Sequence, residues 1–98
     1  MVPKRLQGVL WSRSIEGIDV EKDKNYIVHQ ILAYGTWEDL RWLFATYDKS
    51  EIRDIFTKYP QKDYVMPAFK FVKNILLGIK ESNLDAARYD RNAPRITG

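Results

Sequence analysis

The sequence predicts an all-α fold: a compact bundle of about four helices with an N-terminal extension and a mobile C-terminal tail. Three observations support this prediction. Apolar residues recur with helical spacing through most of the chain, no long stretch alternates as a strand would, and Gly or Pro closes the helical runs. A chain of 98 residues is large enough for one domain with a single core. We expect that domain to span residues 1–80, followed by a tail at 81–98.

The first helix is expected to begin near Asp19 or Val20 and to end before Gly35, a residue type that often follows a helix C-terminus. Its apolar side chains gather on one side at ~100° per residue. They are Ile27, Val28, Ile31, Leu32 and Tyr34. His29 and Gln30 point away from that side, so we interpret His29 as a solvated surface histidine.

The second and third helices follow after tight breaks, and each begins with a capping pattern. Thr36 with Asp39 is a variant of the capping box, and Asp48 with Glu51 repeats it. The core stripe of the second helix is predicted at Trp37, Leu40, Leu43, Phe44 and Tyr47. The stripe of the third is predicted at Ile52, Ile55, Phe56 and Tyr59. Pro60 then ends the third helix.

The fourth helix is predicted to start at Pro67, since proline suits a first helical position, and to stop at Gly78. Its buried residues are expected to be Phe69, Val72, Ile75, Leu76 and Ile79. Beyond residue 80 the chain has few large apolar residues and no sustained period. A mobile tail is therefore favoured there over a short helical turn at 84–89.

The sequence does not indicate catalytic or metal-binding chemistry. His29 is the single histidine, and there is no cysteine with which it could share a metal ion. Carboxylate pairs occupy the helix starts, where the helix dipole favours negative charge. Phosphate-binding glycine loops, serine elbows and zinc spacings are absent from the sequence. We therefore expect a protein that is not an enzyme and holds no metal or other cofactor.

The same features predict a cytoplasmic protein. A chain with no cysteine fits a reducing compartment. No apolar stretch reaches the length of a membrane span, and the N-terminus lacks the apolar core of a signal peptide. We accordingly expect no membrane partner.

The second and third helices follow each other as in a helix-turn-helix, whose second helix enters the major groove of DNA. The exposed side of that helix is predicted to carry Ser50, Glu51, Arg53, Asp54, Thr57 and Lys58. Two carboxylates there offset two cations, and the net charge of the chain is only +3, so attraction for phosphate is weak. A DNA-binding transcriptional regulator is the alternative function, and a self-associating module is a third.

Protein binding is the favoured function, because the chain is rich in the aromatic residues that dominate interfaces. Trp42 falls opposite the core stripe of its helix, so either Leu10 and Trp11 cover it or it anchors a partner. The basic and aromatic residues of the tail form either a solubilising tail or a segment that orders on a partner. The predicted partner-binding residues are Trp11, Trp42, Arg88, Tyr89, Arg91 and Arg95.

Several short motifs resemble a family of small helical proteins of bacteria and archaea. The matching residues are Leu10 and Trp11, Tyr34 and Gly35, Asp39 with Trp42, Leu43 and Tyr47, and Glu51 with Ile52. The chain departs from that pattern at Ser12 and Arg13, where several members carry an acidic residue. Members are often encoded beside an abortive-infection-type nucleotidyltransferase, in the arrangement of a toxin and its antitoxin. The resemblance implies an antitoxin-like protein that binds and neutralises such a partner.

Overall fold

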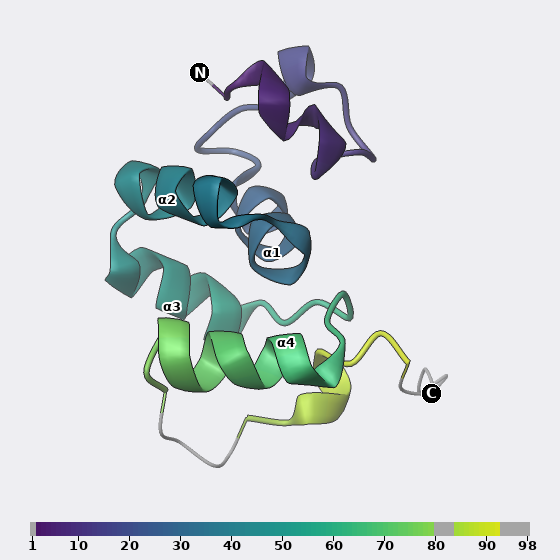
Figure 1. Ribbon diagram of the computed structural model, residues 1–98, viewed down its shortest axis with the longest axis vertical. Coiled ribbons are helices and arrows are strands. Elements are labelled where there is room, and N and C mark those ends of the chain that lie inside the picture. The colour runs from purple at the N-terminus through teal and green to yellow at the C-terminus, as the bar shows by residue number, and fades with distance from the viewer. Residues whose placement is uncertain (1, 80–83, 93–98) are drawn as a thin grey trace.

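The computed structural model describes residues 2–79 and 84–92, and over these ranges the chain is helical, without strands (Figure 1). The four α-helices of these ranges are α1 (Lys24–Tyr34), α2 (Trp37–Thr46), α3 (Lys49–Lys58) and α4 (Met66–Phe71). Shorter elements are the 3₁₀ turns η1 (Lys4–Gly8), η2 (Ile15–Gly17) and η4 (Ala86–Arg88), and the π-helical turn η3 (Val72–Leu76). The predicted all-α fold of about four helices is confirmed. None of these helices is long and apolar enough to cross a membrane.

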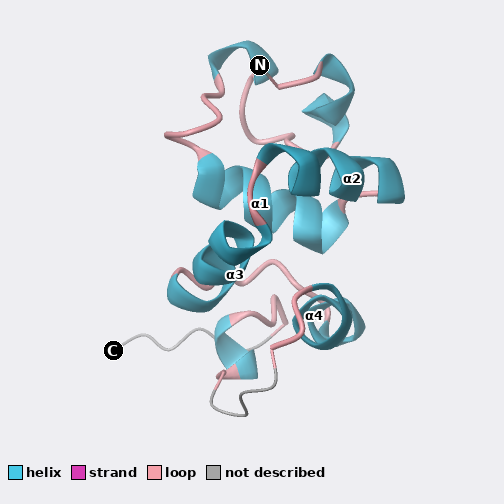
Figure 2. Cartoon of the chain, turned by 90° about the vertical axis from the view of Figure 1, so that its left-hand side faces the viewer, coloured by secondary structure: helices cyan, strands magenta, loops and turns pink. Residues whose placement is uncertain are grey.

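The elements lie in successive layers along the longest axis of the molecule (Figure 1). The N-terminal segment with η1 and η2 covers one side of the crossed pair α1 and α2. α3 lies on the other side of that pair, and α4 with η4 closes the far end (Figure 2). Leu6 and Leu10 of the N-terminal segment are fully buried, so this extension is part of the core.

α1 begins at Lys24, later than the sequence predicted, because a separate turn precedes it. The Asp19 carboxylate accepts hydrogen bonds from the backbone N–H groups of Glu21 and Lys22, at 2.8 and 2.9 Å. A short side chain that bonds its own backbone in this way holds a turn and delays the helix. The end of α1 at Tyr34 agrees with the prediction.

Gly35 joins α1 to α2 and is needed there for space. Its φ of −76° is open to any residue, so the left-handed conformation that often follows a helix is not used here. A Cβ atom at this position would lie 2.6 Å from the carbonyl oxygen of Ile31 and 3.1 Å from Cβ of Asp39. Only glycine therefore allows α1 and α2 to approach so closely.

The two predicted capping patterns have different outcomes. Thr36 and Asp39 form a complete capping box, with the Thr36 N–H donating to Asp39 Oδ2 at 2.9 Å. The Asp39 N–H donates in turn to Thr36 Oγ1 at 3.4 Å. The second pattern was wrong: Asp48 precedes α3 but makes no side-chain cap bond. The Glu51 carboxylate instead accepts a hydrogen bond from Lys24 Nζ at 3.0 Å, which joins α3 to α1.

Every layer contributes buried side chains to the core. Its most deeply buried apolar residues include Leu6, Leu10, Ile27, Ile31, Leu43, Ile52, Phe56 and Leu77. Three residues predicted for the core are exposed instead: Trp37 by 69%, Tyr59 by 54% and Ile75 by 68%. Trp37 and Tyr59 lie at the ends of α2 and α3, where neighbouring elements cover their side chains only in part. Ile75 lies in the π-helical turn, whose wider spacing changes which residues share a face.

Residues 84–92, within the predicted tail, pack against the bundle. The Tyr89 side chain is buried, and its hydroxyl donates to the carbonyl oxygen of Phe56 at 2.7 Å. The backbone N–H of Tyr64 donates to the Tyr89 carbonyl, and the N–H of Arg91 donates to the Tyr64 carbonyl, both at 3.0 Å. These bonds make an isolated parallel bridge between Tyr64 and Asp90. Residues 80–83 and 93–98 lie outside the described residues.

Candidate functional site

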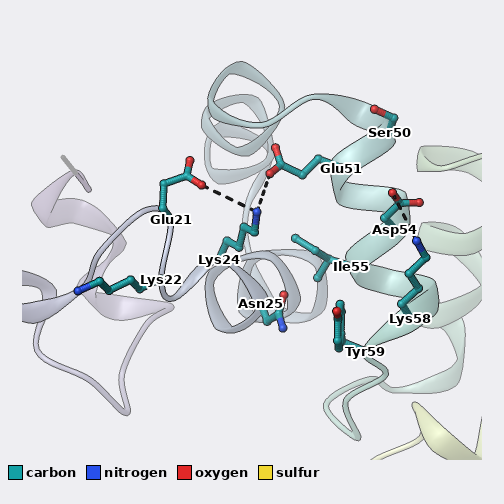
Figure 3. Close-up of a pocket in the computed structure, with 10 residues that line it drawn as sticks. All are labelled: Glu21, Lys22, Lys24, Asn25, Ser50, Glu51, Asp54, Ile55, Lys58 and Tyr59. Atoms are coloured by element: carbon teal, nitrogen blue, oxygen red, sulfur yellow. Dashed lines mark hydrogen bonds and ion pairs between the residues drawn. The ribbon is translucent and has the colours of Figure 1, made fainter.

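A charged groove with a volume of about 470 Å³ lies between the start of α1 and the exposed side of α3 (Figure 3). Its charged lining residues are three acidic and three basic ones: Glu21, Lys22, Lys24, Glu51, Asp54 and Lys58. Lys24 Nζ lies 3.0 Å from the Glu51 carboxylate and 3.8 Å from that of Glu21. Lys58 Nζ lies 3.9 Å from the Asp54 carboxylate. Lys22 forms no ion pair among the described residues, but the three carboxylates balance the three cations, so the groove has little net charge with which to attract a ligand.

Two pairs of aromatic rings that are exposed at least in part flank the turn between α1 and α2. We refer to them, together with the exposed Ile75, as the aromatic surface: Trp11 with Tyr34, and Trp37 with Phe71. The Trp11 ring packs edge-on against Tyr34 at a centroid distance of 4.7 Å, and Trp11 remains 56% exposed. Trp37 packs edge-on against Phe71 at 6.2 Å, and these two are 69% and 38% exposed. Large rings in this number are uncommon on a surface without a partner.

The backbone that carries this surface is held firmly. Trp37 is the first residue of α2, directly after the capping box of Thr36 and Asp39. Arg5 of η1 adds an ion pair, with its guanidinium 2.7 Å from Asp39 Oδ1. A hollow of about 430 Å³ beside this ion pair is lined by Trp11 among others. The capping box already bonds two backbone N–H groups at the start of α2 and places the Asp39 carboxylate there, which disfavours an anion in the hollow.

His29 is buried, which corrects the prediction of a solvated histidine. Its Nε2 lies 2.7 Å from the carbonyl oxygen of Tyr59, and its Nδ1 lies 2.8 Å from the hydroxyl of Tyr64. A carbonyl oxygen can only accept a hydrogen bond, so Nε2 carries the proton and donates to it. Nδ1 then accepts a hydrogen bond from the tyrosine hydroxyl. Burial lowers the pKa of His29 to about 4, so the ring is neutral at pH 7. Among the described residues, no group of three or more His, Cys, Asp or Glu side chains is placed to hold a metal ion.

The structure brings two of the predicted partner-binding residues together. Trp11 from the N-terminal segment and Arg91 from the C-terminal segment both contact the ring of Tyr34. The Arg91 guanidinium carbon lies 5.8 Å from the centroid of that ring, at a distance suited to a cation–π interaction. Arg88 is exposed at the end of η4.

The other predicted partner-binding residues are placed differently. Trp42 is half-buried, packs against the core and meets Tyr47 edge-on at 6.4 Å. The sequence suggested that Trp11 could cover Trp42, but the Trp11 ring packs against Tyr34. Tyr89 is 1% exposed, so no face of its ring is open to a partner in this conformation. Arg95 lies outside the described residues.

Residues 6–56 match the model of DUF6922, a family of unknown function, and this is more than half of the chain. The chain belongs to this family. No curated protein and no solved structure matches it. The DUF6922 region runs from η1 to α3 and contributes Trp11, Tyr34 and Trp37 to the aromatic surface. Phe71 and Ile75 lie beyond the matched residues, so the surface combines the DUF6922 region with the segment that follows it.

Of the aromatic surface, the sequence predicted only Trp11 as a partner-binding residue. Tyr34 was expected in the core and is half-buried, and the other three members were missed for different reasons. Phe71 lies about 200° from the buried Phe69 on a helical projection, which places it opposite the core side of its helix. The same observation singled out Trp42, so the exposure of Phe71 could have been predicted from the sequence. Trp37 sits at the correct angle for the core but at the first position of its helix. Ile75 is displaced by a π-helical turn that no local sequence pattern announces.

Proposed function

We propose that this DUF6922 protein is a non-catalytic, antitoxin-like protein that binds and neutralises another protein through its aromatic surface. The observation that carries the binding function is the exposure of Trp37, which is 69% accessible and packs against the partly exposed Phe71. Tryptophan and tyrosine dominate the residues that contribute most to binding at protein interfaces. The nature of the partner, a nucleotidyltransferase toxin, rests on the resemblance of the sequence motifs. A cytoplasmic location belongs to the same proposal, supported by the absence of cysteine.

The physical basis of the proposal is that the anchor residue is held in position before binding. The capping box and the pair between Arg5 and Asp39 fix the backbone at Trp37. A preorganised anchor loses little conformational entropy when it binds, so more of the burial energy appears as affinity. Burial of one central tryptophan commonly contributes on the order of 2–4 kcal/mol at an interface. The protein would then inhibit its partner sterically, by covering the entrance to the active site.

The alternative of DNA binding has less support from the charges of α3. On the exposed side of this helix, the Lys58 cation is paired with Asp54, and Glu51 is paired with Lys24. Phosphate contacts of Lys58 would have to compete with its ion pair, and the two exposed cations of α3 that form no ion pair among the described residues, Lys49 and Arg53, are too few for strong attraction to DNA. Binding of the full chain to its own promoter at low salt, in the absence of binding to a protein, would favour this alternative.

The test is co-expression of the full chain with a nucleotidyltransferase toxin of the abortive-infection type, with growth rate and complex formation as readouts. We expect the intact protein to restore growth and to form a stable complex. We expect Trp37→Ala to weaken the complex at least about tenfold. Tyr59→Ala is the matched control, because Tyr59 is 54% exposed but lines the charged groove. No complex with the intact protein, or equal effects of the two variants, would contradict the proposal.

A further inference from the structure

Two exposed basic residues lie within one helical turn of members of the aromatic surface. Arg41 lies one helical turn after Trp37 on α2, and Lys70 directly precedes Phe71 on α4; both side chains are exposed. Among residues 2–79 and 84–92, neither forms an ion pair with a carboxylate. These two cations are therefore open to a negative charge brought by another molecule.

The apolar part of this region extends along α2. Leu40 and Phe44 follow Trp37 at the i+3 and i+7 positions, and both are only half-buried. Residues at this spacing share one face of a helix. Arg41 lies on the same face, next to them. The contact of Trp37 with Phe71 joins this face to α4, where Ile75 is 68% exposed.

The acidic residue nearest in sequence to this region is Glu38, which follows Trp37 and lines the hollow beside Trp11. Its backbone carbonyl oxygen lies 3.4 Å from a guanidinium nitrogen of Arg5, and its exposed carboxylate forms no ion pair among the described residues. Asp39 is paired with Arg5. The exposed charges that follow or precede the aromatic residues here are therefore the two cations, Arg41 and Lys70, against the one carboxylate of Glu38, which leaves a net positive charge.

We propose that the partner contacts this region with an acidic segment, in which large apolar side chains are flanked by carboxylates. The inference rests on the proposed function and specifies the chemistry of the partner. The apolar side chains would cover Trp37, Phe71 and Ile75, and the carboxylates would pair with Arg41 and Lys70. Opposite charges at the edge of an interface chiefly raise the association rate, and salt weakens them.

The experiment measures association of the full chain with the same nucleotidyltransferase of the abortive-infection type, by surface plasmon resonance at several salt concentrations. The test variant is the double charge reversal Arg41→Glu and Lys70→Glu. The matched control is Lys49→Glu with Arg53→Glu, which changes the net charge equally at two exposed cations of α3. We expect the test variant to lower the association rate about tenfold or more at low salt, and the control to lower it less than about threefold. Circular dichroism confirms that both variants fold.

The outcomes separate this inference from the proposed function. A tenfold loss that disappears at high salt supports the acidic segment. If Trp37→Ala weakens the complex while both charge reversals act equally or not at all, the acidic segment is wrong and the proposed function stands. If charge reversal at Arg41 and Lys70 strengthens binding, the partner surface is basic and the inference is overturned. Absence of any complex overturns the proposed function and this inference with it.

Discussion

Two groups of aromatic residues in this protein have opposite surroundings. The buried aromatic cluster consists of His29, Phe56, Tyr64, Phe69 and Tyr89, whose rings meet at centroid distances between 4.8 and 6.5 Å. The aromatic surface has rings that meet in pairs and otherwise face solvent. The residue types are similar in both. The difference teaches that coverage by neighbouring elements, and not aromatic content, decides whether a ring stabilises the fold or remains open for binding.

The polar groups of the two regions also differ: those in the buried aromatic cluster have partners within the protein, and the cations near the aromatic surface do not pair with a carboxylate among the described residues. In the buried aromatic cluster, the Tyr64 and Tyr89 hydroxyls and both His29 nitrogens have hydrogen-bond partners. No buried side-chain nitrogen or oxygen in the described part of the chain lacks a partner. At the aromatic surface, Arg41 and Lys70 have no carboxylate partner among those residues. We therefore expect substitutions inside to change stability, and those outside to change binding.

The largest expected effect on stability comes from Tyr89→Ala. Loss of a ring that contacts Phe56 and Phe69, each at 4.8 Å, should lower the free energy of unfolding by about 3–5 kcal/mol. Tyr89→Phe keeps the ring and removes only the hydroxyl bond to the Phe56 carbonyl, so we expect a loss of about 1 kcal/mol. Urea denaturation measures both values. A loss below about 1 kcal/mol for Tyr89→Ala would show that residues 84–92 do not stabilise the bundle.

The second effect is a loss of stability in acid that depends on His29. Burial lowers its pKa from 6.5 to about 4, so the folded state binds this proton less readily than the unfolded chain. The stabilisation is complete above pH 6.5 and is lost as the pH falls towards about 4, where it has decreased by about 3 kcal/mol. Denaturation from pH 7 to pH 4 measures it. His29→Gln is the control, because it lacks this titration and should show a correspondingly shallower pH dependence.

The smallest expected effect on stability is that of Trp37→Ala. Its side chain is 69% exposed, so we expect a change of less than about 0.5 kcal/mol in the free energy of unfolding. The same variant is expected to weaken the complex at least about tenfold. The separation of these two readouts would distinguish the aromatic surface from the buried aromatic cluster. A loss of 2 kcal/mol or more would instead place Trp37 among the residues that hold the fold together.

Features of the fold that depend on neighbouring residues in the sequence were predictable. The capping box of Thr36 and Asp39 acts over three residues, and it was recognised together with the start of α2. Gly78 has the positive φ of 60° that suits the end of a helical run, as its residue type indicated. The Asp48 pattern failed because Glu51 is held by Lys24, which lies 27 positions away in the sequence.

Features that depend on tertiary cover were not predictable in the same way. A helical projection shows that His29 and Ile27 point in different directions, but not that Tyr64 covers the histidine side of α1. Residues 84–92 have no helical period, yet the Tyr89 ring and the backbone bridge to Tyr64 hold them on the bundle. For the candidate site, Trp11 and Arg91 are predicted partner-binding residues whose side chains are exposed, whereas their shared contact with Tyr34 required the structure.

Tyr34 is touched by side chains from both ends of the described chain, by Trp11 on one hand and by Arg91 on the other. Its ring protons therefore feel the ring current of an indole and the charge of a guanidinium at once. In a nuclear magnetic resonance spectrum, the signals of this one tyrosine would shift when either terminal segment separates from α1. Tyr34 thus offers a built-in reporter with which the opening of each segment can be followed in solution.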